Sequence, residues 1–444
     1  MNRSSIYISA LLFTVLCPLR SLNAQENGAW DLKRCIDYAT EHNLTVKSKD
    51  ISLQQNQLDL STAKFSRLPD LSASASQNFS FGRGLSEANT YVNTNTASTS
   101  FSLGASLNVF NGFRVNKTIK LNALNLEAAT ADLEKARDDI RIQVVRAYVQ
   151  ILYNQEIMKV AQSQVAIDSA QVERLRAMFS TGKASAAEVA RQEASLGQSR
   201  LTLTQAANSL ELSLLDLTQL LELPYLEGFK IQPPDTSYTY LLPAGGPDTI
   251  YEEALGIRPA IKAEESRLKA SDVNIAIAKS AWYPSISLSG GLGTNYYVSK
   301  GYPAANFWNQ LSNNFSQYVG ISLNIPIFHK MATKNSVKGA KLSRLQQQIQ
   351  FESVRKGLYK EIQQAWYNAI AAQSKFVSCS DALSSAELSF ELTQAKYENG
   401  KANVTEFNES KNALMKANSD MLQARYEYMF NTKLLDFYRG SEIQ

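Results

Sequence analysis

The amino-acid sequence repeats itself once, and this internal duplication limits the folds that the chain can adopt. A shift of 218 residues pairs Gly182-Lys183-Ala184 with Gly400-Lys401-Ala402 without a gap. The same shift also pairs Phe110 with Phe328, Ala147-Tyr148 with Ala365-Trp366, Glu188 with Glu406 and Leu217 with Leu435. Near the start of each copy the shift is 215, so a three-residue length difference separates the two registers. The sequence therefore predicts two similar structural units.

Composition sets two other segments apart from these units. Residues 1–24 combine basic Arg3, a short apolar run and a final small residue, Ala24, which is the pattern of a secretory signal peptide. An uncleaved anchor would need about 20 apolar residues, and lipid attachment at Cys17 would need a small residue where Leu16 stands. Residues 224–247 hold five prolines and Gly245-Gly246, which interrupt regular structure. We expect a signal peptide at 1–24, a first repeat at 25–223, a linker at 224–247 and a second repeat at 248–444.

The charge balance and the apolar runs exclude two classes of protein. The chain has 45 basic and 41 acidic residues, whereas a nucleic-acid-binding protein normally shows a clustered basic excess. Beyond residue 24 no run of 18 apolar residues occurs, so a helical membrane span is excluded on length. Cys35 and Cys379 fall in different repeats without the spacing of a disulfide framework, and we expect free thiols.

Each repeat opens with a predicted helix and continues with a pair of predicted strands. The helices span residues 31–66 and 248–281, and each ends before a proline. Alternation of apolar with small or polar residues then predicts strands at 71–81, 101–110, 286–297 and 318–328. Strands of about 9–11 residues are long enough to cross a bilayer. A soluble β-hairpin remains the alternative.

The segments between the paired strands, 82–99 and 299–316, read as polar and irregular. They carry Tyr91, Tyr302, Phe307, Trp308 and Phe315. Aromatic residues in such places fit the interface belt of a membrane barrel. Four strands cannot close a barrel, and an open sheet edge has no hydrogen-bond partners in lipid. If these strands span a membrane, several protomers must therefore contribute to one barrel.

Long coiled-coil helices follow the strands in both repeats. Apolar residues lie seven apart at Val144, Ile151, Met158, Val165, Val172 and Phe179, and again at Ile362, Ala369, Phe376, Leu383, Phe390 and Tyr397. The spacing restarts after each glycine as Val189, Leu196, Leu203, Leu210 and Leu217, and as Phe407, Leu414, Met421, Tyr428 and Leu435. A strict seven-residue period predicts two supercoiled antiparallel hairpins. The helices before the tips, 117–178 and 335–396, would each reach about 90 Å. An exported coiled-coil scaffold is the alternative reading.

The duplicated order of helix, strand pair, long helix, tip and return helix resembles that of the TolC-like outer-membrane efflux channels. Residues 107–112 and 324–328 close the strand pairs, and the tips 179–184 and 397–402 resemble the aromatic-x-x-Gly signature of that family. The resemblance implies a mainly α fold with membrane β-structure. Three protomers would form a 12-strand β-barrel in the outer membrane of a Gram-negative bacterium and a 12-helix tunnel through the periplasm.

The resemblance also implies a function and a set of partners. The homotrimer would be a passive exit duct in contact with outer-membrane lipid, supplied by a periplasmic adaptor protein and an inner-membrane transporter. No nucleic acid, cofactor or metal is expected. The sequence has no Gly-rich phosphate loop, and its two histidines, His42 and His329, are far apart and outside any metal-binding spacing. We therefore expect no enzymatic activity. A non-conducting assembly scaffold is the competing function.

Family gates carry an aromatic residue, an arginine and two acids near the second tip. These positions fall on Tyr397, Ala402, Glu406 and Glu409, so the arginine is missing, and the neighbouring Lys401 is a candidate substitute. The matching first-copy candidates are Phe179, Glu188 and Arg191, with Gly182 and Gly400 as tip glycines. Independently of the family, two glutamates three apart share a helix face. In a narrow pore they would form acidic rings that favour cations, although a solvated helix face is the simpler reading.

Overall fold

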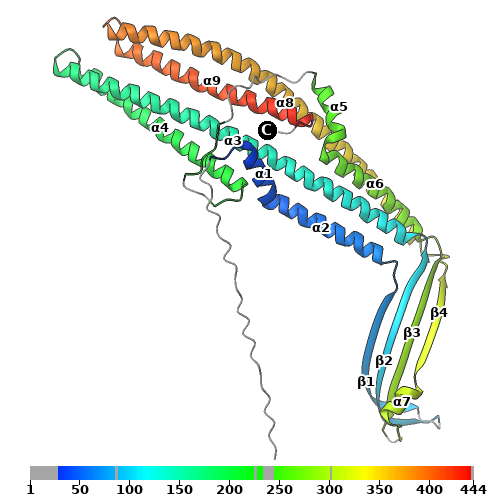
Figure 1. The fold of residues 1–444 in the computed structure, drawn as a ribbon. Helices are drawn as coiled ribbons and strands as arrows, with labels where there is room; N and C mark the ends of the chain where they lie inside the picture. The colour runs from blue at the N-terminus through cyan, green and yellow to red at the C-terminus, as the bar shows by residue number, and fades with distance from the viewer. Residues whose placement is uncertain (1–28, 86–88, 225–227, 234–244, 301–302, 442–444) are drawn as a thin grey trace, which may run out of the picture.

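The computed structural model describes residues 29–85, 89–224, 228–233, 245–300 and 303–441. The molecule is elongated, with long helices at one end and a single sheet at the other (Figure 1). The predicted signal peptide, Tyr302 and most of the predicted linker lie outside the described residues.

The two halves of the chain follow the same order of elements. The first contains α1 (Leu32–His42), α2 (Leu44–Phe65), β1 (Asp70–Leu85), β2 (Tyr91–Asn111), α3 (Arg114–Ser180) and α4 (Ala186–Leu220). The second contains α5 (Pro247–Ile257), α6 (Pro259–Ser280), β3 (Ser285–Ser299), α7 (Phe307–Asn313), β4 (Ser316–Asn324), α8 (Ala332–Glu398) and α9 (Val404–Tyr438). The described residues thus place the helix α7 in the second half alone, in a segment that the sequence predicted to be irregular.

Each opening helix is broken in two, whereas the sequence predicted one continuous helix per repeat. Asn43 adopts an extended conformation between α1 and α2, and its side chain accepts a hydrogen bond from the Thr45 amide at 2.9 Å. Arg258 takes the corresponding place before Pro259, which disfavours a helical conformation at the preceding residue. An N-cap asparagine and an X-Pro pair therefore divide the two helices.

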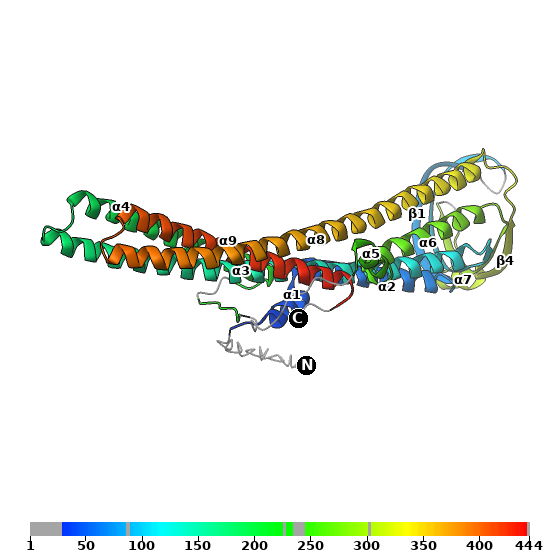
Figure 2. The ribbon, with the colours of Figure 1, turned by 90° about the horizontal axis from the view of Figure 1, so that it is seen from above.

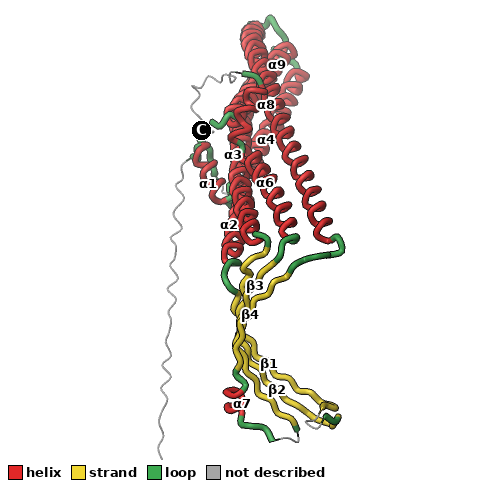
Figure 3. The backbone as a smooth tube through the Cα atoms, turned by 90° about the vertical axis from the view of Figure 1, so that its right-hand side faces the viewer, coloured by secondary structure: helices red, strands yellow, loops and turns green. Residues whose placement is uncertain are grey.

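The four strands form one antiparallel sheet in the order β1-β2-β3-β4, so β2 and β3 join the two halves of the chain. The helices lie beyond one end of this sheet (Figure 3). The register places apolar side chains on a common face: Leu71, Ala73, Phe101, Leu103, Leu288, Leu292, Val319 and Ile321. Serine and glycine dominate the other face, including Ser74, Ser102, Gly291 and Gly293. The sheet is thus apolar on one side and polar on the other.

Three of the strands are longer than the sequence predicted, and β4 is shorter. The pairing of β1 with β2 runs as far as Tyr91, through a stretch of Thr, Ser and Asn in which no residue alternation marks a strand. Cross-strand hydrogen bonds between polar side chains, such as that of Ser74 with Ser102 at 2.7 Å, accompany this pairing. β4 ends at Asn324, short of the predicted 328, because Pro326 has no amide proton for the ladder.

The helices α3 and α8 have 67 residues each and are the longest elements of the molecule. At 1.5 Å per residue each spans about 100 Å. α3 forms a hairpin with α4, and α8 forms a second hairpin with α9 (Figure 1). The predicted seven-residue seams are buried or half-buried in both hairpins, except that Phe179 at the first tip is 51% exposed. No helix in the described part of the chain is long and apolar enough to cross a membrane.

Two hydrophobic clusters hold the middle of the molecule together. The larger one gathers α1 around the centre of α3, where Val144 and Ile151 are fully buried and the Tyr148 hydroxyl donates to the Trp30 carbonyl at 3.2 Å. The smaller one packs α5 against α8 and α9 through Ile250, Ile362 and Leu435. Cys35 is buried and Cys379 half-buried, and both are free thiols, as the sequence predicted.

Candidate functional site

The tips of the two hairpins lie together at the end of the molecule farthest from the sheet (Figure 2). Gly182 and Gly400 have φ angles of +73° and +70°, a left-handed conformation that side chains with a Cβ rarely adopt. The next amide in each tip returns to the helix: Lys183 N–H donates to Met178 O and Lys401 N–H to Lys396 O, both at 2.8 Å. Space around both glycines is open, so backbone conformation alone requires glycine at these tips.

At the first tip, Glu188 is bound within its own hairpin. The Ser185 amide donates to the Glu188 carboxylate at 2.8 Å, and the Glu188 amide donates to Ser185 Oγ at 3.2 Å. This reciprocal capping box begins α4. The hydrogen bonds from Ser185 lower the pKa of the Glu188 carboxyl below its usual range. The structure therefore gives this gate candidate a local capping contact.

At the second tip, Asn403 has the capping position and both candidate acids are exposed. The Asn403 side chain accepts from the Thr405 and Glu406 amides, each at 2.9 Å, and donates to Glu406 Oε1 at 3.0 Å. Glu409 lies one turn further along α9. The Glu406 carboxylate therefore lies in the first turn of α9, at the positive end of the helix dipole, which stabilises negative charge.

The two aromatic residues that match each other in the repeats have different surroundings. Tyr397 is half-buried, with its ring stacked on Phe407 at a centroid distance of 5.0 Å and the Arg174 guanidinium 5.3 Å from its centroid. Burial raises the pKa of the Tyr397 hydroxyl, and the Arg174 charge partly offsets that rise. Phe179 is exposed instead. Tyr397 is thus fixed by packing, whereas Phe179 projects from the first tip.

Two arginines of the first hairpin reach the second one. Arg191 Nη1 donates to Thr405 Oγ1 at 2.9 Å, and Arg174 Nη2 donates to the Glu398 carbonyl at 3.4 Å. Lys401 is exposed, and its ammonium forms no ion pair with any residue that the structure describes. Among the candidates, Arg191 therefore joins the two tips, and Lys401 does not.

A buried ion pair that was not predicted from the sequence also links the hairpins. Lys411 Nζ of α9 donates to the Asp168 carboxylate of α3, and neither side chain has any solvent exposure. Gln192 Nε2 donates to the Asp168 carboxylate at 3.0 Å, and Gln192 Oε1 accepts from Asn408 Nδ2 at 3.0 Å. Ser199 also donates to this carboxylate. The network thus connects α3, α4 and α9, roughly 20 Å from the tips along the helices.

The heptad pattern carried a signal for this pair. Asp168 stands three residues after Val165, and Lys411 stands four residues after Phe407, so both occupy the apolar side of their helices. A charged residue in a coiled-coil seam needs a partner, because an unpaired buried charge is costly. Their relation across two hairpins, however, follows only from the tertiary structure.

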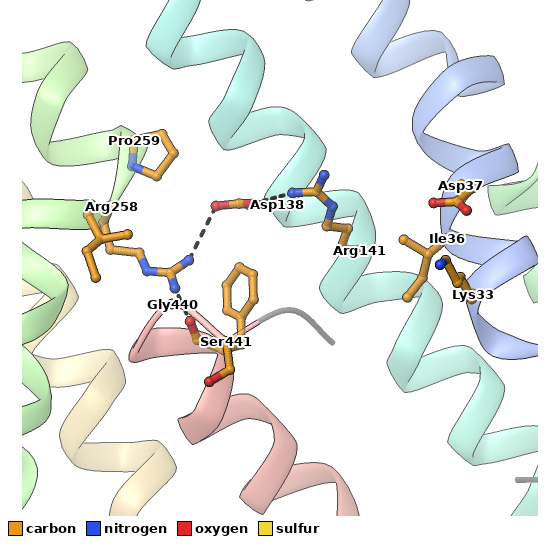
Figure 4. A pocket seen from close by; sticks show the side chains of 11 residues that line it. Lys33, Ile36, Asp37, Asp138, Arg141, Arg258, Pro259, Gly440 and Ser441 are labelled. Atoms are coloured by element: carbon orange, nitrogen blue, oxygen red, sulfur yellow. Dashed lines mark hydrogen bonds and ion pairs between the residues drawn. The ribbon is translucent and has the colours of Figure 1, made fainter. Parts of the chain in front are cut away.

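A pocket of about 280 Å³ lies far from the tips, where α6 meets α3 and the end of α9 (Figure 4). The buried Arg258 donates to Asp138 at 3.3 Å and to the Phe437 carbonyl, and its guanidinium stacks over the Phe437 ring. Burial raises the pKa of Asp138, an effect that Arg258 partly offsets. These contacts fasten the start of α6 to both hairpins. Across the described ranges, no three His, Cys, Asp or Glu side chains form a group able to hold a metal ion.

Known proteins resemble this chain over most of its length. Outer membrane efflux protein BepC of Brucella suis biovar 1 (strain 1330) is 21% identical over 392 residues, covering 88% of this chain and 80% of that protein. Outer membrane protein TolC of Escherichia coli (strain K12) is 23% identical over 384 residues, covering 84% and 74%. The crystal structure of the outer membrane protein VceC from Vibrio cholerae superposes with a TM-score of 0.78 at 18% identity, covering 93% and 97%.

The family model described as outer membrane efflux protein matches residues 35–222 and 250–438. These two matches leave out the chain ends and a central segment, and together they cover well over half of the sequence. The resemblance to TolC-like channels that the sequence suggested is thereby confirmed. The chain belongs to the outer membrane efflux protein family.

Proposed function

We propose that the protein is one protomer of a trimeric outer-membrane channel that works as a passive exit duct. The duct would receive its substrates from an inner-membrane transporter through a periplasmic adaptor protein. In this proposal residues 1–24 are removed on export, and the repeats 25–223 and 248–444 each contribute one hairpin and two strands. The duct has no enzymatic role.

The two-sided sheet is the observation that carries this proposal. One face is mainly apolar and the other is lined mainly by serine and glycine, as in a barrel with lipid outside and water inside. β1 and β4 are edge strands, and open edges are not tolerated in lipid. Joining β4 of one copy to β1 of the next would remove them. Each copy has a four-stranded sheet, so three copies would supply the twelve strands of the proposed barrel.

The helices offer matching surfaces for the same assembly. α2 carries an apolar stripe at seven-residue spacing that is exposed in the single chain: Leu44, Ile51, Leu58 and Phe65. The start of α8 exposes a second one: Leu342, Leu345 and Ile349. Each stripe is the pattern of one face of a coiled-coil interface. Packing α2 of one copy against α8 of the next would bury both stripes and continue the barrel as a helical tunnel.

The mass of the purified protein in mild detergent tests the assembly. We expect a trimer, because a monomer would leave both sheet edges and both helical stripes exposed. Native mass spectrometry measures the stoichiometry directly. A monomer at every protein concentration tested would contradict the proposal.

We further propose that the tips form the periplasmic gate of the duct. The candidates are Phe179, Glu188, Arg191, Tyr397, Lys401, Glu406 and Glu409, with Gly182 and Gly400 as the tip glycines. The exposed Glu406 and Glu409 would form two acidic rings in a trimer. Arg191 would take over the role of the missing gate arginine, because it already bonds to Thr405 across the hairpins.

Removing the charges at the proposed gate separates the effect of electrostatics on ion selectivity from the effect of pore width. Glu406→Gln with Glu409→Gln keeps the side-chain shape, and we expect a loss of cation selectivity in a salt gradient. The reversal potential of single channels measures it. Glu193→Gln is a control, because this glutamate lies on the first hairpin outside the proposed rings and is paired there with Arg176. An unchanged reversal potential in the double variant would refute the acidic rings and leave the channel itself intact.

A further inference from the structure

The helix α7 lies at the end of the sheet that is farthest from the long helices (Figure 1). It interrupts the chain between β3 and β4, which are paired only as far as Gly293 and Ser316. The first half has no such helix among its described residues. The two strand pairs therefore differ at the end of the barrel that the proposed function places outside the cell.

Polar side chains of this segment take the place of β4 along the remainder of β3. Gln310 accepts from the Tyr297 amide at 2.9 Å and donates to the Tyr297 carbonyl at 3.0 Å, as a neighbouring strand would. Asn314 donates to the Asn295 carbonyl at 2.8 Å. The edge of β3 is thus satisfied by side chains, and α7 is held firmly against it.

The contacts of α7 place it on the apolar side of the sheet. Thr294 and Tyr296 point to the same face as Leu292 and Leu288, because side chains two apart share a face of a strand. Thr294 Oγ1 donates to the Leu311 carbonyl at 2.6 Å, and the ring centroids of Tyr296 and Phe307 are 5.0 Å apart. α7 therefore packs on the face that the proposed barrel turns toward lipid.

The exposed surface of this segment suits the boundary between lipid and water. Trp308 is 73% exposed beside the half-buried Phe307, and Phe315 is 56% exposed. The intervening exposed residues are uncharged amides and Ser312, and no Asp, Glu, Lys or Arg occurs from 301 to 329. Tryptophan is characteristic of the interfacial layer of a membrane, where its apolar ring and its polar N–H are both accommodated.

We propose that α7 lies on the outside of the barrel in the outer interfacial layer of the membrane and binds lipid through Trp308 and Phe315. This proposal rests on the proposed function, because it requires the sheet to span a bilayer. The ligand proposed for the surface of Trp308 and Phe315 is membrane lipid. A helix folded into the water-filled lumen is the outcome that would contradict it.

Quenching by brominated phosphatidylcholine in vesicles tests the position of Trp308. The difference in emission between the wild-type trimer and Trp308→Phe isolates this one indole and leaves the buried Trp30 untouched. We expect lipid brominated near the ester carbonyls to remove at least about half of that emission, and lipid brominated near the chain ends to remove less. The same subtraction with Trp366→Phe is the control, because Trp366 lies in α8, and it should show no quenching.

Phe101→Trp distinguishes failure of this inference from failure of the channel proposal. Phe101 lies on the apolar face of β2, so a tryptophan there reports whether the sheet spans the bilayer. Quenching at position 101 together with an unquenched Trp308 that iodide in the water reaches would overturn the lipid site alone. Absence of quenching at both positions would show that the sheet does not span, and both proposals would be wrong.

Discussion

The helices α3 and α8 have equal lengths and equal places in the two halves, yet they differ in what covers them. α3 buries seventeen residues against α1, α2, α4, α6 and α9. α8 buries six and packs against α5, α6 and α9. Both begin after a residue in the left-handed conformation, Phe113 and Met331. The two repeats thus share the length and the start of this helix. They differ in its surroundings, because α3 is central to the protomer and α8 has a long exposed side.

The protomer therefore covers α3 on most sides and leaves one side of α8 uncovered. The surroundings of α3 are formed within one chain, so substitutions there test the fold. The exposed side of α8 continues past its start through Leu388 and Leu392, and large uncovered apolar surfaces usually mark an interaction site. Substitutions on α8 should therefore test the assembly.

The largest effect is expected on the exposed side of α8. Leu342→Asp with Ile349→Asp would bury two charges per interface, each at a cost of several kcal/mol. We expect the trimer fraction to fall more than about tenfold, with helical content retained. Size-exclusion chromatography with light scattering measures the assembly, and circular dichroism measures the fold. Gln350→Asp, at an exposed polar position of the same helix, should leave the trimer intact. A double variant that is fully trimeric would show that this side of α8 is not an interface.

The next effect concerns the ion pair between the hairpins. Lys411→Met would leave the Asp168 carboxylate buried without a positive partner, and we expect a loss of about 3–5 kcal/mol in the stability of the hairpin pair. Hydrogen exchange of the amides in α9 would report this loss. Adding Asp168→Leu should recover most of it, because the pair is then replaced by apolar groups. Equal exchange in wild type and Lys411→Met would show that the pair does not hold the two hairpins together.

A smaller effect distinguishes the caps of the two tips. Ser185→Ala removes the capping box of α4. Asn403→Ala removes the side chain that accepts hydrogen bonds from two backbone amides of α9. Each should destabilise its own tip by about 1 kcal/mol. Local hydrogen exchange in the first turns of α4 and α9 measures both. Fraying of both tips by either variant would contradict the local character of the caps.

The smallest effect is a pH dependence confined to the first tip. Hydrogen bonds from Ser185 hold the pKa of Glu188 below its ordinary value of 4.5. The carboxylate therefore stabilises this cap at pH values above about 4.5, and its contribution is lost as the pH falls through the lower folded-state pKa. Exchange at the start of α4 should rise with acidification. Glu188→Gln keeps a capping side chain and should remove this dependence, whereas persistence of the dependence would assign it to another group.

Most of the fold could be predicted from repetition and periodicity. The seven-residue seam through Val144 and Ile362 predicted the long helices because burial along a coiled coil repeats regularly. The start of β2 was missed because its threonines and asparagines do not alternate with apolar residues. α7 was missed because its seven residues form only about two turns, which is too short for a helical repeat of apolar residues to be recognised. Its capping residue, Asn306, is also common in loops.

The candidate site was predictable in position but not in its contacts. Gly182 and Gly400 identified the tips because a left-handed turn requires glycine. The bond from Arg191 to Thr405 and the pairing of Asp168 with Lys411 join residues more than 200 positions apart. No local pattern sets such a pairing, because the packing of the two hairpins brings the partners together. The roles of the gate candidates stay predictions.

Single-channel recording in a planar bilayer shows whether the protein forms a conducting pore. The purified trimer should give discrete conductance steps, because a closed barrel with a polar inner face lets ions through the membrane. The Leu342→Asp, Ile349→Asp variant, prepared in the same detergent, should give none at equal protein concentration. A wild-type protein that inserts into the bilayer as a trimer and shows no conductance at any voltage would contradict the channel and favour the scaffold.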